Sequence, residues 1–337
     1  MEDHSTNNNN SRRDFLQKVG LIASGTVMGG AAMFAGFKFE TSKKKESRIK
    51  ALTAEHQLIE VEAEGHSHPV EDMLTELQLQ GREGIPDKRW VMVIDLAKCR
   101  NARQCMKACQ GAHELRPEQH HINVLQMQDS ENTAPYFMPK PCQHCDNPPC
   151  VSVCPVDATF KRPDGIVLID NERCIGCRFC VAACPYSARI FHWNEPLKEQ
   201  EYKENKSKYS QMIAEGKQEE AKELEKKVTY DVELNVPQRR GTISKCLFSA
   251  DRLRVGQMPY CVSACPNGVY YFGDENEDAV TNGTTKQTVR LSGLLRDNAG
   301  YRLMEELGTK PRVYYLPPKN RLFPFPEETL ITNEHHS

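Results

Sequence analysis

Residues 138–186 read MPKPCQHCDNPPCVSVCPVDATFKRPDGIVLIDNERCIGCRFCVAACPY and contain two cysteine runs, each ending in Cys-Pro. The chain has four cysteine runs, numbered 1 to 4, which begin at Cys99, Cys142, Cys174 and Cys246, and all but run 1 end in Cys-Pro. Run 3 has the spacing C-x2-C-x2-C-x3-C-P, in which three thiolates bind one iron–sulfur cluster and the fourth binds a neighbouring one. This exchange predicts two [4Fe–4S] clusters. The ligands of one are Cys142, Cys145, Cys150 and Cys184, and those of the other are Cys174, Cys177, Cys180 and Cys154.

Two other roles for these eight cysteines fit less well. Structural zinc sites divide their ligands two and two over a longer gap. Disulfides are compatible with an even number of cysteines, but not with eight of them packed between Cys142 and Cys184 with proline after each run. The spacing therefore favours clusters, which indicate electron-transfer chemistry.

The chain has fourteen cysteines, and the other six form two incomplete runs on either side. Run 1 has Ala102 at its second position, and run 4 has Ser249 there. If these runs exchange ligands like the inner pair, Cys99, Cys105 and Cys265 share one site, and Cys109, Cys246 and Cys261 share another. We expect the first to hold [3Fe–4S] or no cluster, because alanine cannot bind iron.

The site of Cys109, Cys246 and Cys261 is less determined by the sequence. Ser249 or water could complete an irregular cluster there, or the site could hold none. A competing interpretation is that both outer sites have decayed and that their six thiols are free or form disulfides, which an exported protein would permit.

The chain resembles the four-cluster, ferredoxin-like electron-transfer subunits of membrane-bound molybdopterin-type oxidoreductases, such as tetrathionate, polysulfide and dimethyl sulfoxide reductases. The resemblance covers roughly residues 88 to 318. It is carried by residues 138–186 and by VMVIDLAKC (91–99), VPQRRGTISKC (236–246), PYCVSACPNGVYYFGD (259–274) and YRLMEELGTKPRVYYLPP (301–318). It implies an electron relay between a large catalytic subunit and a multi-span membrane subunit that handles quinone. Ala102 and Ser249 depart from the family's pattern of sixteen cysteines, in the half of the relay that lies nearer the catalytic subunit in this family.

Composition agrees with a protein partner rather than a nucleic acid. There are 44 Lys and Arg against 46 Asp and Glu, a net charge of −2, so the chain has no basic excess. Only 39% of the residues are hydrophobic, which is little for a chain of 337 residues. We expect bound clusters to replace part of the core and to contribute to folding.

The amino-terminal sequence predicts an export signal. Ser11-Arg12-Arg13-Asp14-Phe15-Leu16 precedes an apolar stretch at residues 19–37, as in twin-arginine signals. This route carries folded protein and would deliver assembled clusters to the periplasm or the outer face of the cytoplasmic membrane. An ordinary basic region before an apolar segment is the alternative. Whether the segment is removed or stays as an anchor is open.

The fold class predicted is α+β, with tandem ferredoxin-like modules, a helical insertion and a C-terminal extension. Short strands at residues 93–95 and 168–170 precede runs 1 and 3 at the same offset, which indicates an internal repeat. Leucines at 291, 294 and 295 and the stretch 303–307 predict helix, and residues 312–316 predict a strand. The proposed segments are a signal at 1–38, an N-terminal extension at 39–89, a cluster core at 90–194, a charged helical insertion at 195–240, the last cysteine group at 241–280 and a C-terminal extension at 281–337.

A basic residue stands directly before the first cysteine of three runs: Lys98, Arg173 and Lys245. Such cations could favour reduced, more negative clusters, or they could be ordinary solvated surface charges.

A different class of function is an enzyme in which an iron without a cysteine ligand, at an outer site, binds substrate as a Lewis acid. Its acid–base groups would come from His113, Glu114, His120 and His121, which lie near run 1 in the sequence.

Overall fold

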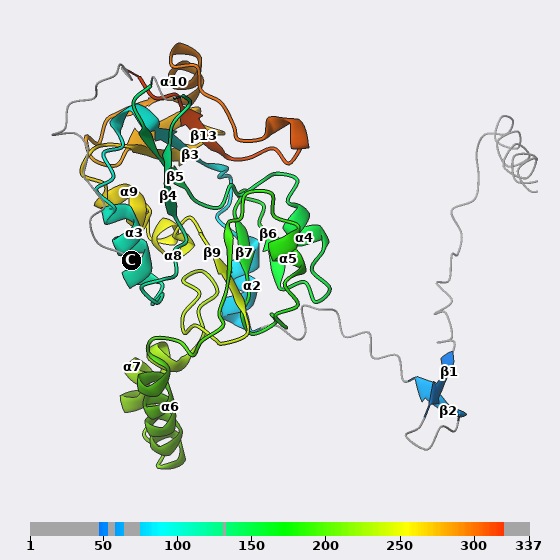
Figure 1. The fold of residues 1–337 in the computed structure, drawn as a ribbon. Coiled ribbons are helices and arrows are strands. Elements are labelled where there is room, and N and C mark those ends of the chain that lie inside the picture. The colour runs from blue at the N-terminus through cyan, green and yellow to red at the C-terminus, as the bar shows by residue number, and fades with distance from the viewer. Residues whose placement is uncertain (1–46, 53–57, 64–74, 131–132, 320–337) are drawn as a thin grey trace, which may run out of the picture. The chain divides into compact units, whose positions relative to one another are not determined.

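The computed structural model describes residues 47–52, 58–63, 75–130 and 133–319 (Figure 1). The twin-arginine segment lies outside these residues. The chain divides into two units, residues 1–67 and 68–337, and each is described by itself. In the first unit, β1 (Ser47–Leu52) pairs with β2 (Leu58–Ala63) as an antiparallel hairpin.

The second unit is organised around a five-stranded sheet with the order β12-β11-β10-β3-β13. Its strands are β3 (Trp90–Asp95), β10 (Tyr270–Asp274), β11 (Ala279–Asn282), β12 (Thr288–Arg290) and β13 (Val313–Leu316). Neighbours are antiparallel, except that β13 runs parallel to β3. The strand expected at 312–316 is therefore confirmed. It pairs with β3, the strand that leads into run 1.

Both faces of β3 are buried, which suits its sequence WVMVID. Met92 and Ile94 pack into the main core together with the cysteines of the outer runs. Val91 and Val93 face a second cluster with Leu291 of α10 (Leu291–Asp297). The sheet thus forms one wall of the cysteine-rich region.

Three further two-stranded sheets support the other cysteine runs. They are β4 (Asn123–Met127) with β5 (Tyr136–Lys140), β6 (Thr159–Lys161) with β7 (Val167–Ile169), and β8 (Arg189–Phe191) with β9 (Ile243–Lys245). Each run begins within five residues of a strand end, at β3, β5, β7 and β9. The strands before runs 1 and 3 are those that the internal repeat predicted, and the structure adds β5 before run 2 and β9 before run 4.

Short helices follow the first cysteines of the runs. They are α3 (Gln104–Ala112), α4 (Pro149–Ser152), α5 (Phe179–Ala182), α8 (Ala250–Arg254) and α9 (Tyr260–Ala264). Helix α2 (Glu76–Glu83) begins with a capping box between Thr75 and Gln78. Gln78 Nε2 also donates to Asp170 Oδ2 at 2.8 Å, which ties α2 to the loop before run 3.

The Lys- and Glu-rich residues between 195 and 240 contain α6 (Glu199–Ala214) and α7 (Gln218–Val228), which pack against each other (Figure 1). No residue of α6 is buried, and surface ion pairs such as Lys203 with Glu199 at 3.0 Å run along the two helices. Solvated pairs of this kind contribute little to stability.

The helix expected at residues 303–307 is wrong. Only a 3-10 turn forms, at Glu305–Leu307, because Met304 has a positive φ of 48° and Gly308 has one of 66°. Within the described residues, none of the helices has the length and apolarity that a membrane span requires.

Candidate functional site

The structure gathers the fourteen cysteines into four groups. We number these sites 1 to 4. Site 1 is Cys99, Cys105 and Cys265 around Ala102, site 2 is Cys109, Cys246 and Cys261, site 3 is Cys142, Cys145, Cys150 and Cys184, and site 4 is Cys154, Cys174, Cys177 and Cys180. The exchange of the last cysteine between neighbouring runs, expected from the spacing, is the arrangement present. Which cluster each site binds stays a prediction.

All four runs turn in the same way after their first cysteine. The residue two positions later has a positive φ in every run: Asn101 (57°), His144 (45°), Gly176 (70°) and Phe248 (54°). Left-handed residues of this kind point successive backbone N–H groups into one concavity, which suits an anion such as an iron–sulfur cluster. Run 1 keeps this turn although Ala102 has replaced the ligand. Gly176 signals the turn in the sequence most clearly and Asn101 less so, because glycine and asparagine adopt positive φ more readily than other residues, whereas Phe248 gives no such signal.

Four helices each connect two neighbouring sites. Cys105 and Cys109 lie four residues apart on α3, so both sulfurs lie on one helix face, one at site 1 and one at site 2. Cys261 and Cys265 connect sites 2 and 1 from α9. Sites 3 and 4 are connected in the same way, by Cys150 and Cys154 from α4 and by Cys180 and Cys184 from α5.

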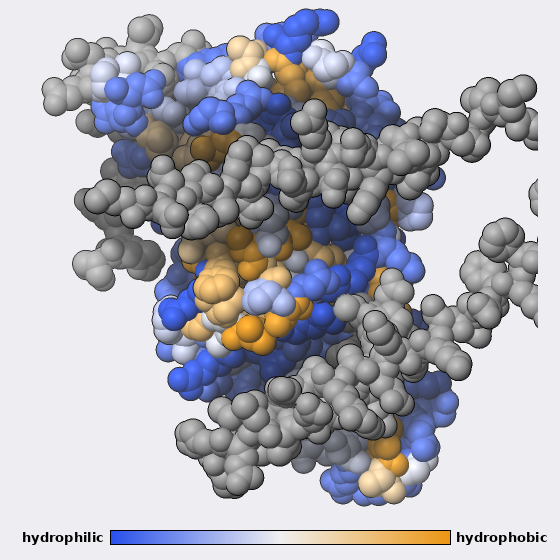
Figure 2. Space-filling view, turned by 90° about the vertical axis from the view of Figure 1, so that its right-hand side faces the viewer, coloured by the Kyte–Doolittle hydropathy of each residue, from blue (hydrophilic) through white to orange (hydrophobic). Residues whose placement is uncertain are grey.

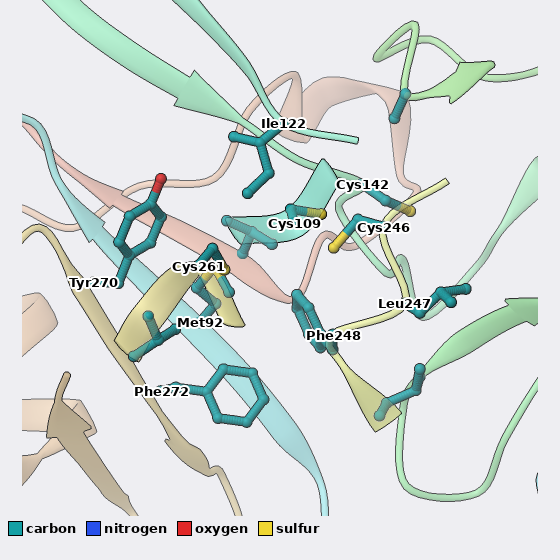
Figure 3. Close-up of a cluster of buried hydrophobic side chains, with 14 of the residues drawn as sticks. Met92, Cys109, Ile122, Cys142, Cys246, Leu247, Phe248, Cys261, Tyr270 and Phe272 are labelled. Carbon is teal, nitrogen blue, oxygen red and sulfur yellow. The ribbon is translucent and has the colours of Figure 1, made fainter. Parts of the chain in front are cut away.

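Sites 2 and 3 meet through Cys246 and Cys142, which belong to runs far apart in the sequence. Figure 3 shows these two side chains next to each other, with Cys109 and Cys261 on neighbouring helices. Burial raises the pKa of the Cys246 thiol to about 11, and the nearby Cys142 thiol contributes to this rise. The sites therefore follow one another in the order 1, 2, 3, 4.

Burial dominates the chemistry of these thiols. It raises the pKa of Cys99 to about 11 and that of Cys145 to about 12, and it raises those of Cys109 and Cys261 well above the ordinary value. Without metal these four thiols are neutral at physiological pH. Metal binding must displace their protons, so thiolate–iron bonds and folding are coupled.

Two buried cations lie among the thiols. Lys245 is fully buried and donates to the carbonyl oxygens of Val167 and Cys246. Burial disfavours the charge of Arg189, but Cys150 and Cys180 raise its pKa. In the described part of the chain, neither cation has a carboxylate partner. A buried cation without a counter-charge is costly, so this environment fits a group with negative charge, as a thiolate-bound cluster has.

The three basic residues before the runs differ in their surroundings. For Lys245 the interpretation as a surface charge is wrong, because its side chain lies inside the protein. Lys98 is 40% exposed and contacts Asp95 and Tyr271. Arg173 donates to the carbonyl oxygen of Val156.

Three further polar residues surround site 2. Ser249 is buried, and its Oγ accepts the N–H of Tyr260 at 3.1 Å. His113 and His121 are buried beside Cys109. Burial lowers the pKa of His113 to about 4 and that of His121 well below its ordinary value, so both rings are neutral. In the sequence these histidines were candidates only for acid–base chemistry. The signal in the sequence that could have placed His113 beside site 2 is its four-residue step from Cys109, which runs to the C-cap of α3.

Comparison with known proteins agrees with this site. The family model described as the 4Fe-4S dicluster domain matches residues 133–202 and 202–275. A selenate reductase subunit of Mesobacillus selenatarsenatis is 34% identical over 318 residues, which cover 91% of this chain and 97% of the relative.

Two other relatives have the same character. A tetrathionate reductase subunit of Salmonella typhimurium is 30% identical, with 84% of this chain and 91% of the relative covered. The iron-sulfur cluster-binding subunit of menaquinone reductase from Nitratidesulfovibrio vulgaris is 35% identical, with 68% and 88% covered. These matches support an electron carrier rather than a Lewis-acid enzyme, and the mixed helices and strands fit an α+β ferredoxin-like fold. The chain belongs to the iron–sulfur electron-transfer subunits of multisubunit molybdopterin-type reductases and is not an enzyme by itself.

Proposed function

We propose that the chain relays electrons along sites 1 to 4 between a large molybdopterin-type catalytic subunit and a multi-span, quinone-linked membrane subunit. The observation that carries this proposal is the unbroken succession of the four sites, through shared helices and through the contact of Cys142 with Cys246. A bound iron–sulfur cluster takes up and releases one electron at a time. The chain's own residues hold the sites next to each other, bury the three thiols of site 2 and supply the positive charge of Lys245 and Arg189.

The ligand sets support a cofactor for each site. Sites 3 and 4 have four thiols each and would hold [4Fe–4S] clusters. Site 1 has three thiols and Ala102, which suits [3Fe–4S]. Site 2 has three thiols and irregular surroundings, and we assign a cluster to it as well, since a relay needs a carrier between sites 1 and 3.

The two ends of the succession differ in surface chemistry, which supports different partners. At site 4, Cys177 is exposed, and the apolar side chains of Ile175 and Phe179 beside it are 64% and 60% exposed. Figure 2 views the molecule from the side on which α4 and α5 lie in Figure 1 and shows hydrophobic residues gathered there. Exposed apolar side chains around a cluster site suit the membrane subunit.

Site 1 has a polar, cationic rim instead. Arg100 is exposed, and Lys98 and Arg103 are partly exposed beside it. We assign this end to the catalytic subunit. The name of the menaquinone reductase relative supports a quinone-linked partner at the other end.

The location proposed is the periplasmic side of the cytoplasmic membrane, after export in the folded state by the twin-arginine route. The support is the sequence around Arg12 and Arg13.

The central experiment is anaerobic purification of the chain, followed by iron and acid-labile sulfide analysis and redox-titrated EPR. The relay predicts signals from two [4Fe–4S] clusters and from one [3Fe–4S] cluster, plus a further cluster at site 2. Colourless, metal-free protein after careful reconstitution would contradict it. Iron for sites 3 and 4 only would limit the relay to those two sites.

A further inference from the structure

Site 2 lacks a fourth thiol, and Ser249 is a poor substitute. Its Oγ already accepts the N–H of Tyr260 at 3.1 Å, and Ser249 stands at the start of α8 with a φ of 52°. A serine binds iron well only as an alkoxide, and an additional buried negative charge is costly. Another donor near Cys109, Cys246 and Cys261 would be a better ligand.

Two histidines lie at this site. The ligand atoms of Cys109, His113 and His121 are within 4.8 Å of one another, and all three residues are buried. His113 caps the C-terminus of α3 four residues after Cys109, so both side chains lie on one face of the helix. His121 reaches the site from the loop before β4.

The hydrogen bond of His113 determines which of its nitrogens is available. Nδ1 lies 2.7 Å from the carbonyl oxygen of Leu234. A carbonyl only accepts, so Nδ1 must carry the proton and Nε2 must carry the lone pair. Histidines that bind metals usually have this arrangement, with one N–H donated to a backbone carbonyl and the other nitrogen on the metal.

His121 has partners for both nitrogens. Nε2 lies 3.0 Å from Ser244 Oγ, and Nδ1 lies 3.8 Å from Cys109 Sγ. This geometry suits a hydrogen bond to the cysteine sulfur, because neither nitrogen is left free for iron.

We propose that His113 Nε2 is the fourth ligand at site 2 and that, with Cys109, Cys246 and Cys261, it binds a [4Fe–4S] cluster. This inference rests on the proposed function, which assigns a cluster to this site. Imidazole is neutral where a thiolate is negative, and histidine ligation raises the reduction potential of iron–sulfur centres. Site 2 would then accept an electron more readily than the same site with four cysteines.

The test uses the full chain, labelled with 15N-histidine, purified anaerobically and reduced. Pulsed EPR should detect a nitrogen hyperfine coupling to one cluster. The coupling should vanish in His113→Ala, which should also lose one iron and gain [3Fe–4S] signal. His113→Cys should restore the iron without the coupling and lower the potential of that cluster. His121→Ala and the partly exposed control His120→Ala should keep the coupling.

Three results would overturn the inference. The coupling persists in His113→Ala, or it is lost in His121→Ala, or His113→Cys leaves the spectrum of the unsubstituted chain unchanged. Failure of the proposed function is distinguishable from these. In that case the unsubstituted chain itself contains too little iron and sulfide for site 2, whichever histidine is present, and the inference falls with it.

Discussion

The rings of His144 and Phe248 stack with their centroids 3.7 Å apart and their planes inclined by 24°. Both residues stand two positions after the first cysteine of their runs, and both have a positive φ, 45° and 54°. A bulky residue in this conformation is uncommon and has a conformational cost. The stack offsets that cost by packing the loop of site 2 against the loop of site 3.

Replacement of Phe248 by Ala should therefore destabilise the junction between sites 2 and 3. Phe248 is 1% exposed, and truncation of a buried phenylalanine costs about 3 kcal/mol or more. The loss should appear as a lower melting temperature of the cluster-loaded chain. Phe179→Ala is the matched control, because Phe179 is 60% exposed and its truncation should have little effect. Equal losses in the two variants would contradict the packing argument.

Exchange of ligands between runs 2 and 3 can be tested by cysteine replacement. Cys154→Ala should alter the same cluster as Cys174→Ala, although Cys154 belongs to run 2, because both cysteines line site 4. Cys184→Ala and Cys145→Ala should both alter the EPR signal of the other cluster, since both cysteines line site 3. EPR redox titration of the four variants is the measurement. A common signature for Cys154→Ala and Cys145→Ala would show that each run binds its own cluster.

Substitution of Lys245 by Met should lower the reduction potential of the clusters at sites 2 and 3. The buried ammonium favours the reduced, more negative form, and its removal takes away that stabilisation. Unit charges ~8 Å apart at an effective dielectric constant of ~20 interact by on the order of 2 kcal/mol, which is about 90 mV for one electron.

The control for Lys245→Met is Lys98→Met, whose side chain is 40% exposed and screened by water. Lys98→Met should shift the reduction potential of every cluster several-fold less than Lys245→Met shifts those of sites 2 and 3. A shift of the same size in both variants would mean that burial of Lys245 has no special electrostatic role.

A carboxylate at the apolar end of the relay should weaken assembly with the membrane subunit. Phe179→Glu introduces a charge beside Cys177 without touching a ligand, so iron content should stay unchanged while recovery of the membrane complex falls. Ile213→Glu on α6 is the matched control, since Ile213 is also exposed, at 38%, but far from the cysteines in sequence. Co-purification with the membrane subunit measures both. Unchanged recovery with Phe179→Glu would exclude this surface.

Twin-arginine export predicts that the double variant Arg12→Lys, Arg13→Lys stays in the cytoplasm with its clusters assembled. Cell fractionation with immunodetection measures the distribution, and the brown colour of the retained protein reports the clusters. Arg48→Lys, outside the motif, is the control. Normal export of the double variant would contradict the signal assignment.

The spacing of the cysteines and of the apolar residues was enough to predict the features that form over a few residues. Within a run, the gaps of two and three residues determine which sulfurs one turn and one short helix can present, so the division of Cys142–Cys184 between two sites was predictable. The strands before the runs and the helix beginning at Leu291 follow from local apolar patterns. The stretch 303–307 failed because Met304 turns the chain in the left-handed region, which a leucine pattern does not reveal.

Tertiary packing decided the rest, because it brings together residues more than a hundred positions apart. The contact of Cys142 with Cys246, the burial of Lys245 and the stacking of His144 on Phe248 depend on how four similar loops pack on one another. The hydrogen bond from His113 to Leu234 is of the same kind. From the sequence alone, the ligand types and their local grouping were determined. The order of the sites, their buried charges and the surroundings of the missing ligands were decided by the fold, because burial and long-range contacts set those energies.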